Sequence, residues 1–287
     1  MSKQTHTVPS DLADKVRLRQ YLVGVFVFLE TGNAVKKAIR NEDVTINGKL
    51  GYSGDWINAN DVIVYDRPEM IKARGKQSKD TKIETLFEND QLIIVRKPAG
   101  LSSSGMKGKS LQRVLYNYKM GDAEDELEYP LIIHRLDRQT EGLIIAAKTM
   151  SAKRLLDEML ANHQIEKHYL ALVEGEIAED ISMISTDVDG KKASTEILNS
   201  EKTENEDVTS LLKIRLHTGR THQIRIHVKE IGHPIVGDTI YNPEGLNFGR
   251  GMMLSANYLK FEDPVSNEII EIEAPVHKKF RKYLQLS

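Results

Sequence analysis

The chain has 287 residues, 40% hydrophobic and 29% charged, a composition typical of a globular protein with room for one large and one small domain. It contains no cysteine, which excludes disulfides, thiolate metal sites and a cysteine nucleophile and fits the reducing cytoplasm where we expect the protein. The net charge is −2, but segments 122–128 and 176–207 together contribute −12, so the other 248 residues carry +10 and RNA binding is not excluded.

The first part of the chain predicts a small α/β unit. Residues 1–9 are polar, and we expect a disordered tail there. Over 10–66 the pattern predicts helices at 12–29 and 34–41, a strand entering an Asn-Gly turn at 47–48, and a closing strand at 61–65. The apolar run 21–29 is too short to cross a bilayer and lacks a small-residue cleavage pattern. It therefore favours a buried helix over a signal peptide, and no membrane association is expected.

A linker and a larger domain follow. Segment 67–82 has no apolar periodicity and carries six basic against two acidic residues, so it is either a solvated tether or a segment that follows a phosphate backbone. From 83 to 287, short apolar strands alternate with one helix at 152–160 and another from about 221. The predicted class is α+β, with a mixed, mostly antiparallel sheet.

The most informative segment is the polar cluster at 134–143, His-Arg-Leu-Asp-Arg-Gln-Thr-Glu-Gly-Leu. It lies between two apolar runs that predict buried strands. A carboxylate on such a connection, Asp137, is held by a rigid scaffold within reach of a cleft. Arg135 and Arg138 flank it in sequence and are expected to keep it ionised. The segment therefore predicts a nucleophilic or basic carboxylate, although a salt-bridged turn is equally consistent with it.

Three further polar segments lie at 166–173, 217–227 and 232–238. Their histidines do not have the spacing of a helical zinc site, and no acidic residue lies between them as in zincins, so we expect no metal and interpret them as hydrogen-bonded side chains: His217, His222, His227 and His233. The Gly-Lys-Ser at 108–110 lacks the spacing of a phosphate-binding loop. Together these features predict no cofactor.

Five motifs in one order resemble the RluA-type RNA pseudouridine synthases. They are Lys-Pro-Ala-Gly-Leu at 97–101, His-Arg-Leu-Asp at 134–137 with Thr140 and Gly142, Lys-x-Tyr-x-Ala-Leu-Val at 167–173, Thr-Gly-Arg-Thr-His-Gln-Ile-Arg at 218–225 and Gly-His-Pro-Ile-x-Gly-Asp at 232–238. The resemblance implies a pseudouridine synthase catalytic domain over 83–287. The small unit at 10–66 resembles the αL-type RNA-binding domain often attached to these enzymes.

The resemblance implies an enzyme that breaks the uracil glycosidic bond, turns the base and rejoins it through carbon 5, without a cofactor. Asp137 carries over as the essential carboxylate, Arg225 as the cation that keeps it charged and aimed, and Tyr169 as the ring under the target base. The other polar positions carry over as RNA contacts: Arg135, Lys167, Arg220, His222 and Gln223. The expected partner is RNA, ribosomal more than transfer RNA, and the expected state is a monomer.

The chain departs from the family pattern at two places near these motifs. Ser102-Ser103-Ser104 replaces a Val-Val-His-Pro-like continuation, which makes the arrangement of a loop near the cleft uncertain. Glu141 stands where a small serine is common, and we expect its charge near incoming phosphates, where it would narrow the range of substrates. In the small unit, Asn33 stands near the place of a usual arginine and removes one expected backbone contact.

Two other functions are consistent with the residues. A protein with the same fold that only binds RNA or assists ribosome assembly would leave no modified uridine. A nucleoside hydrolase using the same carboxylate at a sugar carbon would release free uracil.

Overall fold

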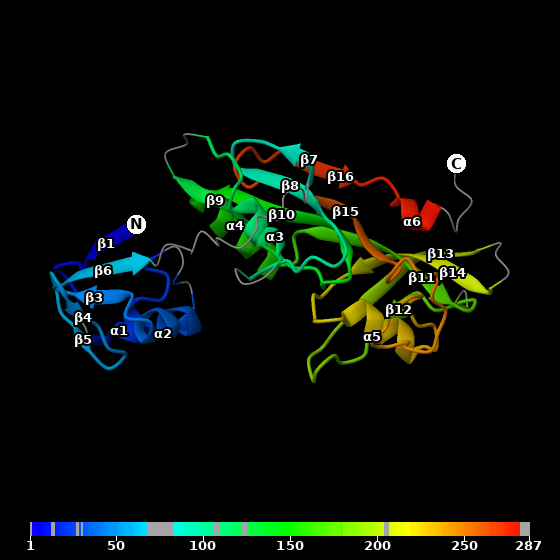
Figure 1. Cartoon of the computed structure of the whole chain (residues 1–287), viewed down its shortest axis with the longest axis horizontal. Coiled ribbons are helices and arrows are strands. Elements are labelled where there is room, and N and C mark those ends of the chain that lie inside the picture. Colours follow the sequence, from blue (N-terminus) through cyan, green and yellow to red (C-terminus); the bar gives the residue numbers. More distant parts are fainter. Residues whose placement is uncertain are drawn as a thin grey trace. The chain divides into compact units, whose positions relative to one another are not determined.

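The structure, a computed structural model, describes residues 2–12, 15–26, 29, 31–67, 83–105, 109–121, 125–178, 180–203 and 207–281. The chain divides into two compact units, Met1–Asp80 and Thr81–Ser287 (Figure 1). Each unit has a hydrophobic core of its own. The predicted linker at 67–82 lies outside the described residues except for Arg67, which ends a strand.

The smaller unit is built on a four-stranded antiparallel sheet. Its order is β1 (Ser2–Thr7), β6 (Val62–Arg67), β3 (Val44–Ile46) and β4 (Lys49–Leu50). The Asn47-Gly48 turn joins β3 to β4 as predicted, with both residues at positive φ (50° and 80°), the geometry of a tight hairpin. A second pair of strands is formed by β2 (Val16–Arg17), which precedes the hairpin in the sequence, and β5 (Trp56–Ile57), which follows it.

Two predictions for this unit were wrong. The tail at 1–9 contains strand β1, which pairs with β6 along its length, because the unpaired edge of β6 accepts a polar strand whose side chains stay partly exposed. Among the described residues of 12–29, the predicted helix is limited to α1 (Leu18–Tyr21), and turns follow it in which Gly24 adopts φ +80°. Four apolar side chains of the predicted helix are nevertheless buried: Leu18, Leu22, Phe26 and Leu29. The second helix, α2 (Gly32–Arg40), matches the prediction more closely.

The larger unit contains one mixed, mostly antiparallel sheet, which confirms the predicted α+β class. One half of the sheet has the order β10 (Glu141–Thr149), β8 (Leu92–Lys97) and β7 (Glu84–Glu88), and β9 (Glu126–Ile132) also pairs with β10. The other half consists of β11 (Glu166–Glu174), β12 (Met183–Ile184), β13 (Thr195–Lys202), β14 (Thr209–Leu216), β15 (Leu254–Glu262) and β16 (Ile269–Glu273).

The two halves meet where β10 and β15 pair in parallel, through Glu141↔Ser255 and Gly142↔Ala256 alone. Gly142 has φ +128°, and a Cβ there would lie 2.1 Å from the Ala256 carbonyl oxygen. Only glycine allows this close approach of the two backbones. We call this pairing of 141–142 with 255–256 the sheet joint.

In the described segments of the larger unit, four helices pack around this sheet: α3 (Leu111–Leu115), α4 (Met150–Ala161), α5 (Gln223–Glu230) and α6 (Lys278–Arg281) (Figure 1). The apolar stripe of α4 places Ala152 and Leu156 in the buried interior, as its spacing predicts. α5 follows β14 and packs on β13. Within the described part of the chain, no helix has the length and apolarity needed to cross a membrane.

Candidate active site

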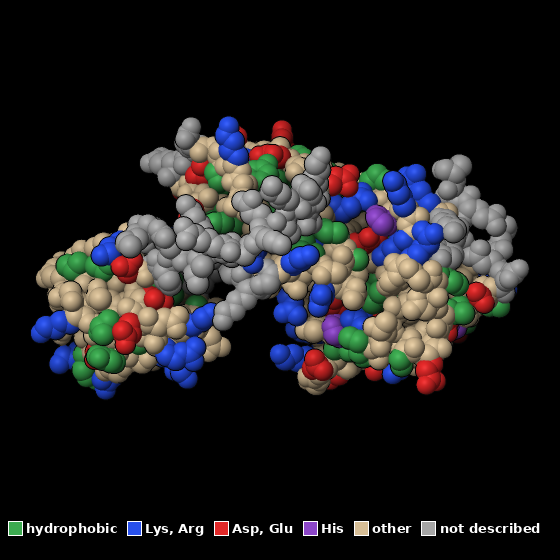
Figure 2. Space-filling model, viewed as in Figure 1, with side chains coloured by type: hydrophobic (Ala, Val, Ile, Leu, Met, Phe, Trp, Pro, Cys, Tyr) green, Lys and Arg blue, Asp and Glu red, His purple; other side chains and the backbone are tan. Residues whose placement is uncertain are grey.

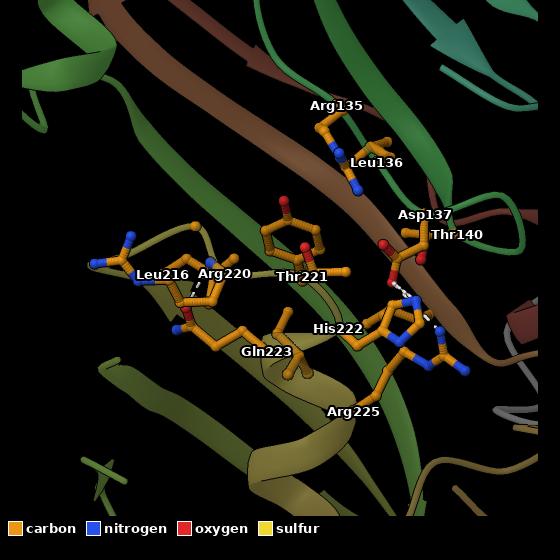
Figure 3. A pocket seen from close by; sticks show the side chains of 14 residues that line it. Arg135, Leu136, Asp137, Thr140, Leu216, Arg220, Thr221, His222, Gln223 and Arg225 are labelled. Atoms are coloured by element: carbon orange, nitrogen blue, oxygen red, sulfur yellow. Dashed lines mark hydrogen bonds and ion pairs between the residues drawn. The ribbon is translucent and has the colours of Figure 1, made fainter. Parts of the chain in front are cut away.

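Asp137 lines a cleft in the larger unit. The connection between β9 and β10 that carries it is closed by a hydrogen bond from the Thr140 amide to the Asp137 carbonyl. The cleft holds about 530 Å³ of space, part of it open to solvent, and its lining includes Arg135, Tyr169, Arg220 and Arg225 (Figure 3). The Asp137 side chain is 18% exposed, so the carboxylate is sheltered yet accessible, as the sequence predicts.

The end of β8 and the segment that follows it hold the connection that carries Asp137. The Ser103 hydroxyl donates to the Leu136 carbonyl (2.7 Å) and accepts from the Leu136 amide (2.8 Å). The fully buried Lys97 ammonium donates to the carbonyls of Leu101 (2.8 Å) and Arg138 (3.4 Å). Burial lowers the pKa of Lys97 to about 8. The serine segment whose arrangement was uncertain from the sequence is therefore a direct support of the site.

Arg225 is the cation that approaches Asp137. Its Nε and Nη2 each donate to Asp238 at 2.7 Å, and its Nη1 reaches Asp137 Oδ2 at 3.4 Å. Burial favours the neutral guanidinium, but hydrogen bonds and charge from Asp238, together with Asp137, raise the pKa of Arg225 overall. A bidentate pair fixes the guanidinium plane. Arg225 therefore stays charged and directs one donor at Asp137 through a long contact that leaves the carboxylate free to react.

Asp238 is a site residue that sequence reasoning did not name, although it ends the Gly-His-Pro-Ile-x-Gly-Asp motif. Its Oδ1 also accepts from the amides of Ile240 (3.0 Å) and Tyr241 (3.2 Å). Burial alone would raise the pKa of Asp238, but the Arg225 and backbone hydrogen bonds lower it. Its position at the end of a largely apolar motif could have indicated Asp238 as a site residue. A carboxylate in such a segment is expected to be buried, and a buried carboxylate needs a cation as partner.

His222 is the second group near Asp137. It caps α5 in the left-handed conformation (φ 58°), and its Nε2 lies 3.8 Å from Asp137 Oδ2. Its Nδ1 lies 3.0 Å from the Tyr241 hydroxyl, and the Tyr241 ring also lies 4.9 Å from the Arg225 guanidinium carbon. Figure 3 shows His222 and Arg225 directed toward Asp137 from the start of α5. Non-glycine residues at positive φ are uncommon and often mark functional sites.

Tyr169 lines the cleft from strand β11, at a β-bulge in the β11–β15 pairing. Bulges next to active sites redirect a side chain. The tyrosine is 7% exposed, and burial together with the Asp137 charge raises the pKa of its hydroxyl. The hydroxyl therefore stays protonated and is suited to donate a hydrogen bond rather than to act as a phenolate base.

The five predicted RNA contacts differ in position. Arg135 and Arg220 line the cleft and are exposed; within the described chain Arg135 has no ion pair, while Arg220 Nε donates to the Lys192 carbonyl (3.1 Å). The Gln223 side chain is buried: its oxygen accepts from Thr218 and the Arg220 amide, and its nitrogen donates to Ser194 and Thr195. Gln223 therefore stabilises the turn before α5, and its side-chain groups are occupied.

Lys167 is not among the residues that line the cleft. Burial lowers its pKa, and its charge helps to lower the pKa of His134 to about 3, after burial of that imidazole. His134 Nε2 accepts the Ile145 amide at 3.1 Å. The first residue of the His-Arg-Leu-Asp motif thus acts as a neutral acceptor that fixes the start of the connection against β10.

Two sequence expectations for charge were wrong. Arg135 and Arg138, expected to keep Asp137 ionised, form no ion pair with it among the described residues. Arg138 instead donates through Nε to the Gly100 carbonyl (3.1 Å), because neighbouring residues of a turn point in different directions. Glu141, expected near incoming phosphates, is buried and lies outside the cleft lining. Its carboxylate lies 3.2 Å from the Lys279 ammonium.

The four histidines that raised the question of a metal have separate partners. His217 lies 2.9 Å from Glu196, His222 contacts Tyr241, His227 lies between Thr195 and the Thr186 carbonyl, and His233 lies 2.9 Å from the Glu174 carbonyl. They are hydrogen-bonded side chains, as the sequence analysis expected.

Basic side chains occur in the lining of the cleft and elsewhere on the larger unit. Figure 2 shows Lys and Arg side chains at several places on the visible face of this unit, with Asp and Glu side chains among them. Arg135 and Arg220, which line the cleft, are exposed, and exposed cations beside a sheltered carboxylate favour binding of a polyanion.

Comparison with known proteins identifies the class. Residues 91–230 match the RNA pseudouridylate synthase family. An uncharacterized RNA pseudouridine synthase of Aquifex aeolicus (strain VF5) is 31% identical over 84% of this chain and 85% of its own length. Ribosomal large subunit pseudouridine synthase C of Vibrio parahaemolyticus (serotype O3:K6, strain RIMD 2210633) is 27% identical over 87% and 86%.

A solved structure agrees with this match. Human RNA Pseudouridylate Synthase Domain Containing 1 is 25% identical, covers 68% of this chain and 84% of its own, and has a TM-score of 0.53. The chain belongs to the RluA-type family of RNA pseudouridine synthases, which are isomerases.

Proposed function

We propose that this protein converts specific uridines of structured RNA, ribosomal RNA rather than transfer RNA, to pseudouridine with Asp137 as the essential carboxylate. The observation that carries the proposal is the Asp137 side chain in the lining of the cleft, with Arg225 Nη1 at 3.4 Å from its carboxylate. The preference for ribosomal RNA is supported by relatives named ribosomal large subunit pseudouridine synthase C.

The reaction is an isomerisation in which atoms balance within the substrate. The N1–C1′ bond breaks, the uracil turns, a C5–C1′ bond forms, the C5 proton leaves and N1 gains a proton. An ionised Asp137 has three routes open to it: attack on the sugar, attack on the base, or proton transfer at the sugar carbon. All three require a charged and accessible carboxylate, which the fixed Arg225 guanidinium favours.

The target base leaves its stack to reach this carboxylate, at a cost of a few kcal/mol. The Tyr169 ring lines the cleft and offers a stacking surface for the everted uracil. Exposed Arg135 is placed to occupy the vacated stack or to contact a phosphate, since no described residue pairs with it. The proposed functional state is a monomer.

The smaller unit is proposed to be an αL-type RNA-binding domain. The surface of α2 carries three exposed cations, Lys36, Lys37 and Arg40, and the opposite face of the helix is buried through Val35, Ala38 and Ile39. A helix with one basic exposed face suits the phosphate backbone of RNA.

The test is a comparison of the wild-type protein with Asp137→Asn on ribosomal and transfer RNA transcripts. Pseudouridine is detected by primer extension after carbodiimide treatment. We expect new stops on ribosomal RNA with the wild type, none with Asp137→Asn, and similar RNA affinity and circular dichroism for both.

Each other outcome overturns a distinct part of the proposal. Retained turnover in Asp137→Asn removes the aspartate from the mechanism. Stops confined to transfer RNA reverse the substrate preference. Free uracil in the chromatogram identifies a hydrolase, and binding without any stops identifies a protein that only binds RNA.

A further inference from the structure

The residues gathered at the cleft come from the two different halves of the sheet. Asp137 lies on the β9–β10 connection of one half, whereas Tyr169, His222 and Arg225 lie on β11 and at the start of α5, in the other half. The strands of the two halves pair through two residue pairs only, at the sheet joint. The distance between Asp137 and its partners therefore depends on how firmly this short joint is held.

A buried ion pair crosses the joint close to the cleft. Glu141 is the first residue of β10, and its Oε1 lies 3.2 Å from Lys279 Nζ, with exposed side-chain fractions of 5% and 7%. Lys279 is fixed to the second half, because its Nζ also donates to the carbonyls of Met252 (2.8 Å) and Leu254 (3.4 Å) at the start of β15. Leu254 itself lines the cleft.

The α6 helix that carries Lys279 is anchored by Phe280, which is fully buried in the larger core. A second side chain from the same segment, His277, lies 3.5 Å from the Glu141 carboxylate. Another contact between the halves, from Asn89 to Asp263 (2.7 Å), lies beyond the opposite end of β15. The Glu141–Lys279 pair is thus a buried ionic contact between the halves at the joint itself, next to the Asp137 connection and separate from the Arg225–Asp137 contact in the cleft.

We propose that the Glu141–Lys279 ion pair is a positioning device that holds the Asp137 half of the sheet against the Tyr169 and Arg225 half. The proposal rests on the function proposed above, in which Asp137 acts on the target uridine. Glu141 follows Asp137 by four residues and is the next residue after Thr140, whose amide is hydrogen-bonded to the Asp137 carbonyl. A shift of the Glu141 backbone therefore moves the Asp137 carboxylate. Displacement of a reacting group by about 1 Å can cost about 100-fold in rate.

A matched control lies at the other end of β10. Lys148 is similarly buried, with a side-chain exposure of 10%, and its Nζ contacts Glu88 (2.9 Å) and the Asn89 carbonyl (2.8 Å). These partners belong to the same half of the sheet, so Lys148→Met removes an ion pair of β10, with Glu88 38% exposed, without releasing the joint.

The experiment compares Glu141→Gln, Lys279→Met, the double variant and Lys148→Met in the full-length protein. Single-turnover rates at saturating RNA, RNA dissociation constants and melting temperatures are measured for each. We expect the rate to fall at least about 10-fold in the three joint variants, with RNA affinity within about twofold, and the double variant to be no slower than the slower single variant. Lys148→Met should lower the melting temperature and leave the rate unchanged.

Hydrogen exchange of the 134–142 peptide gives a readout that does not depend on turnover. Exchange should accelerate in the joint variants and not in Lys148→Met. Unchanged rates and unchanged exchange in Glu141→Gln, whose amide keeps the shape of the carboxylate, would overturn the inference even if Lys279→Met did not fold. If the wild type is inactive while hydrogen exchange of the 134–142 peptide is accelerated in the joint variants, the proposed function is refuted. The inference that the ion pair holds the two halves together would then still stand.

Discussion

At the scale of single residues, variants of Tyr169 distinguish a stacking role of its ring from a proton-transfer role of its hydroxyl. Its ring lines the cleft, and burial raises the pKa of its hydroxyl. We expect Tyr169→Leu to weaken binding of the reacting uridine by about 5- to 150-fold, since loss of base stacking costs about 1–3 kcal/mol. Tyr169→Phe should keep that stacking. If Phe and Leu reduce single-turnover rates equally, the hydroxyl rather than the ring is the essential group.

His134 predicts how stability depends on pH. Burial, with a smaller contribution from Lys167, lowers its pKa from 6.5 to about 3. Between these values the unfolded chain binds more protons than the folded one, so the free energy of unfolding decreases as the pH falls below 6.5. The contribution of this group approaches about 1.4 kcal/mol per pH unit. Protonation at Nε2 also removes the acceptor for the Ile145 amide.

The measurement is chemical denaturation of the wild type and His134→Gln between pH 5 and 7. The variant keeps an acceptor but does not titrate, so its stability should fall less steeply with decreasing pH. His163→Gln, which changes an exposed histidine, is the control and should follow the wild type. Parallel curves for wild type and His134→Gln would show that other groups determine the acid sensitivity.

At the scale of secondary-structure elements, the sheet joint depends on Gly142. A Cβ at this position would lie 2.1 Å from the Ala256 carbonyl oxygen, and its φ of +128° disfavours any other residue. We expect Gly142→Ala to destabilise the larger unit by about 3 kcal/mol or more, through steric overlap and backbone strain. Gly54→Ala, where a Cβ meets nothing within 4 Å, should change the free energy of unfolding by less than about 1 kcal/mol.

Elements with a strong local pattern were predictable from the sequence. The position of Asp137 between two strands and the buried face of α4 could be predicted because both are marked by a short-range pattern of apolar residues, which burial of one face requires. The run at 21–29 misled because it is apolar on all sides, and periodicity then gives no boundary for a helix. Glu141 was misplaced for a different reason: its partner Lys279 is distant in sequence, and only the completed sheet brings the two together. The same applies to Ser103 and Leu136.

At the scale of the whole molecule, the two units have separate hydrophobic cores with no residue in common. Since each core is complete within its own unit, we expect the fragment 81–287 to fold without residues 1–80. All residues that line the cleft belong to this fragment. If the smaller unit binds RNA as proposed, the fragment loses the gain that two linked binding modules provide, which is about 100-fold or more.

The fragment 81–287 should therefore keep its single-turnover rate at saturating RNA within about twofold of the full chain, while its RNA dissociation constant rises by about 100-fold. Every phosphate that the smaller unit neutralises in the full chain adds about 0.7–0.9 to the dependence of log affinity on log salt. RNA affinity is measured at salt concentrations from about 50 to about 300 mM. The slope of log affinity against log salt should be shallower for the fragment than for the full chain. An equal slope and equal affinity would mean that the basic face of α2 does not contact the substrate. A fall in rate at saturation would mean that the smaller unit contributes to the reacting geometry, beyond holding the RNA.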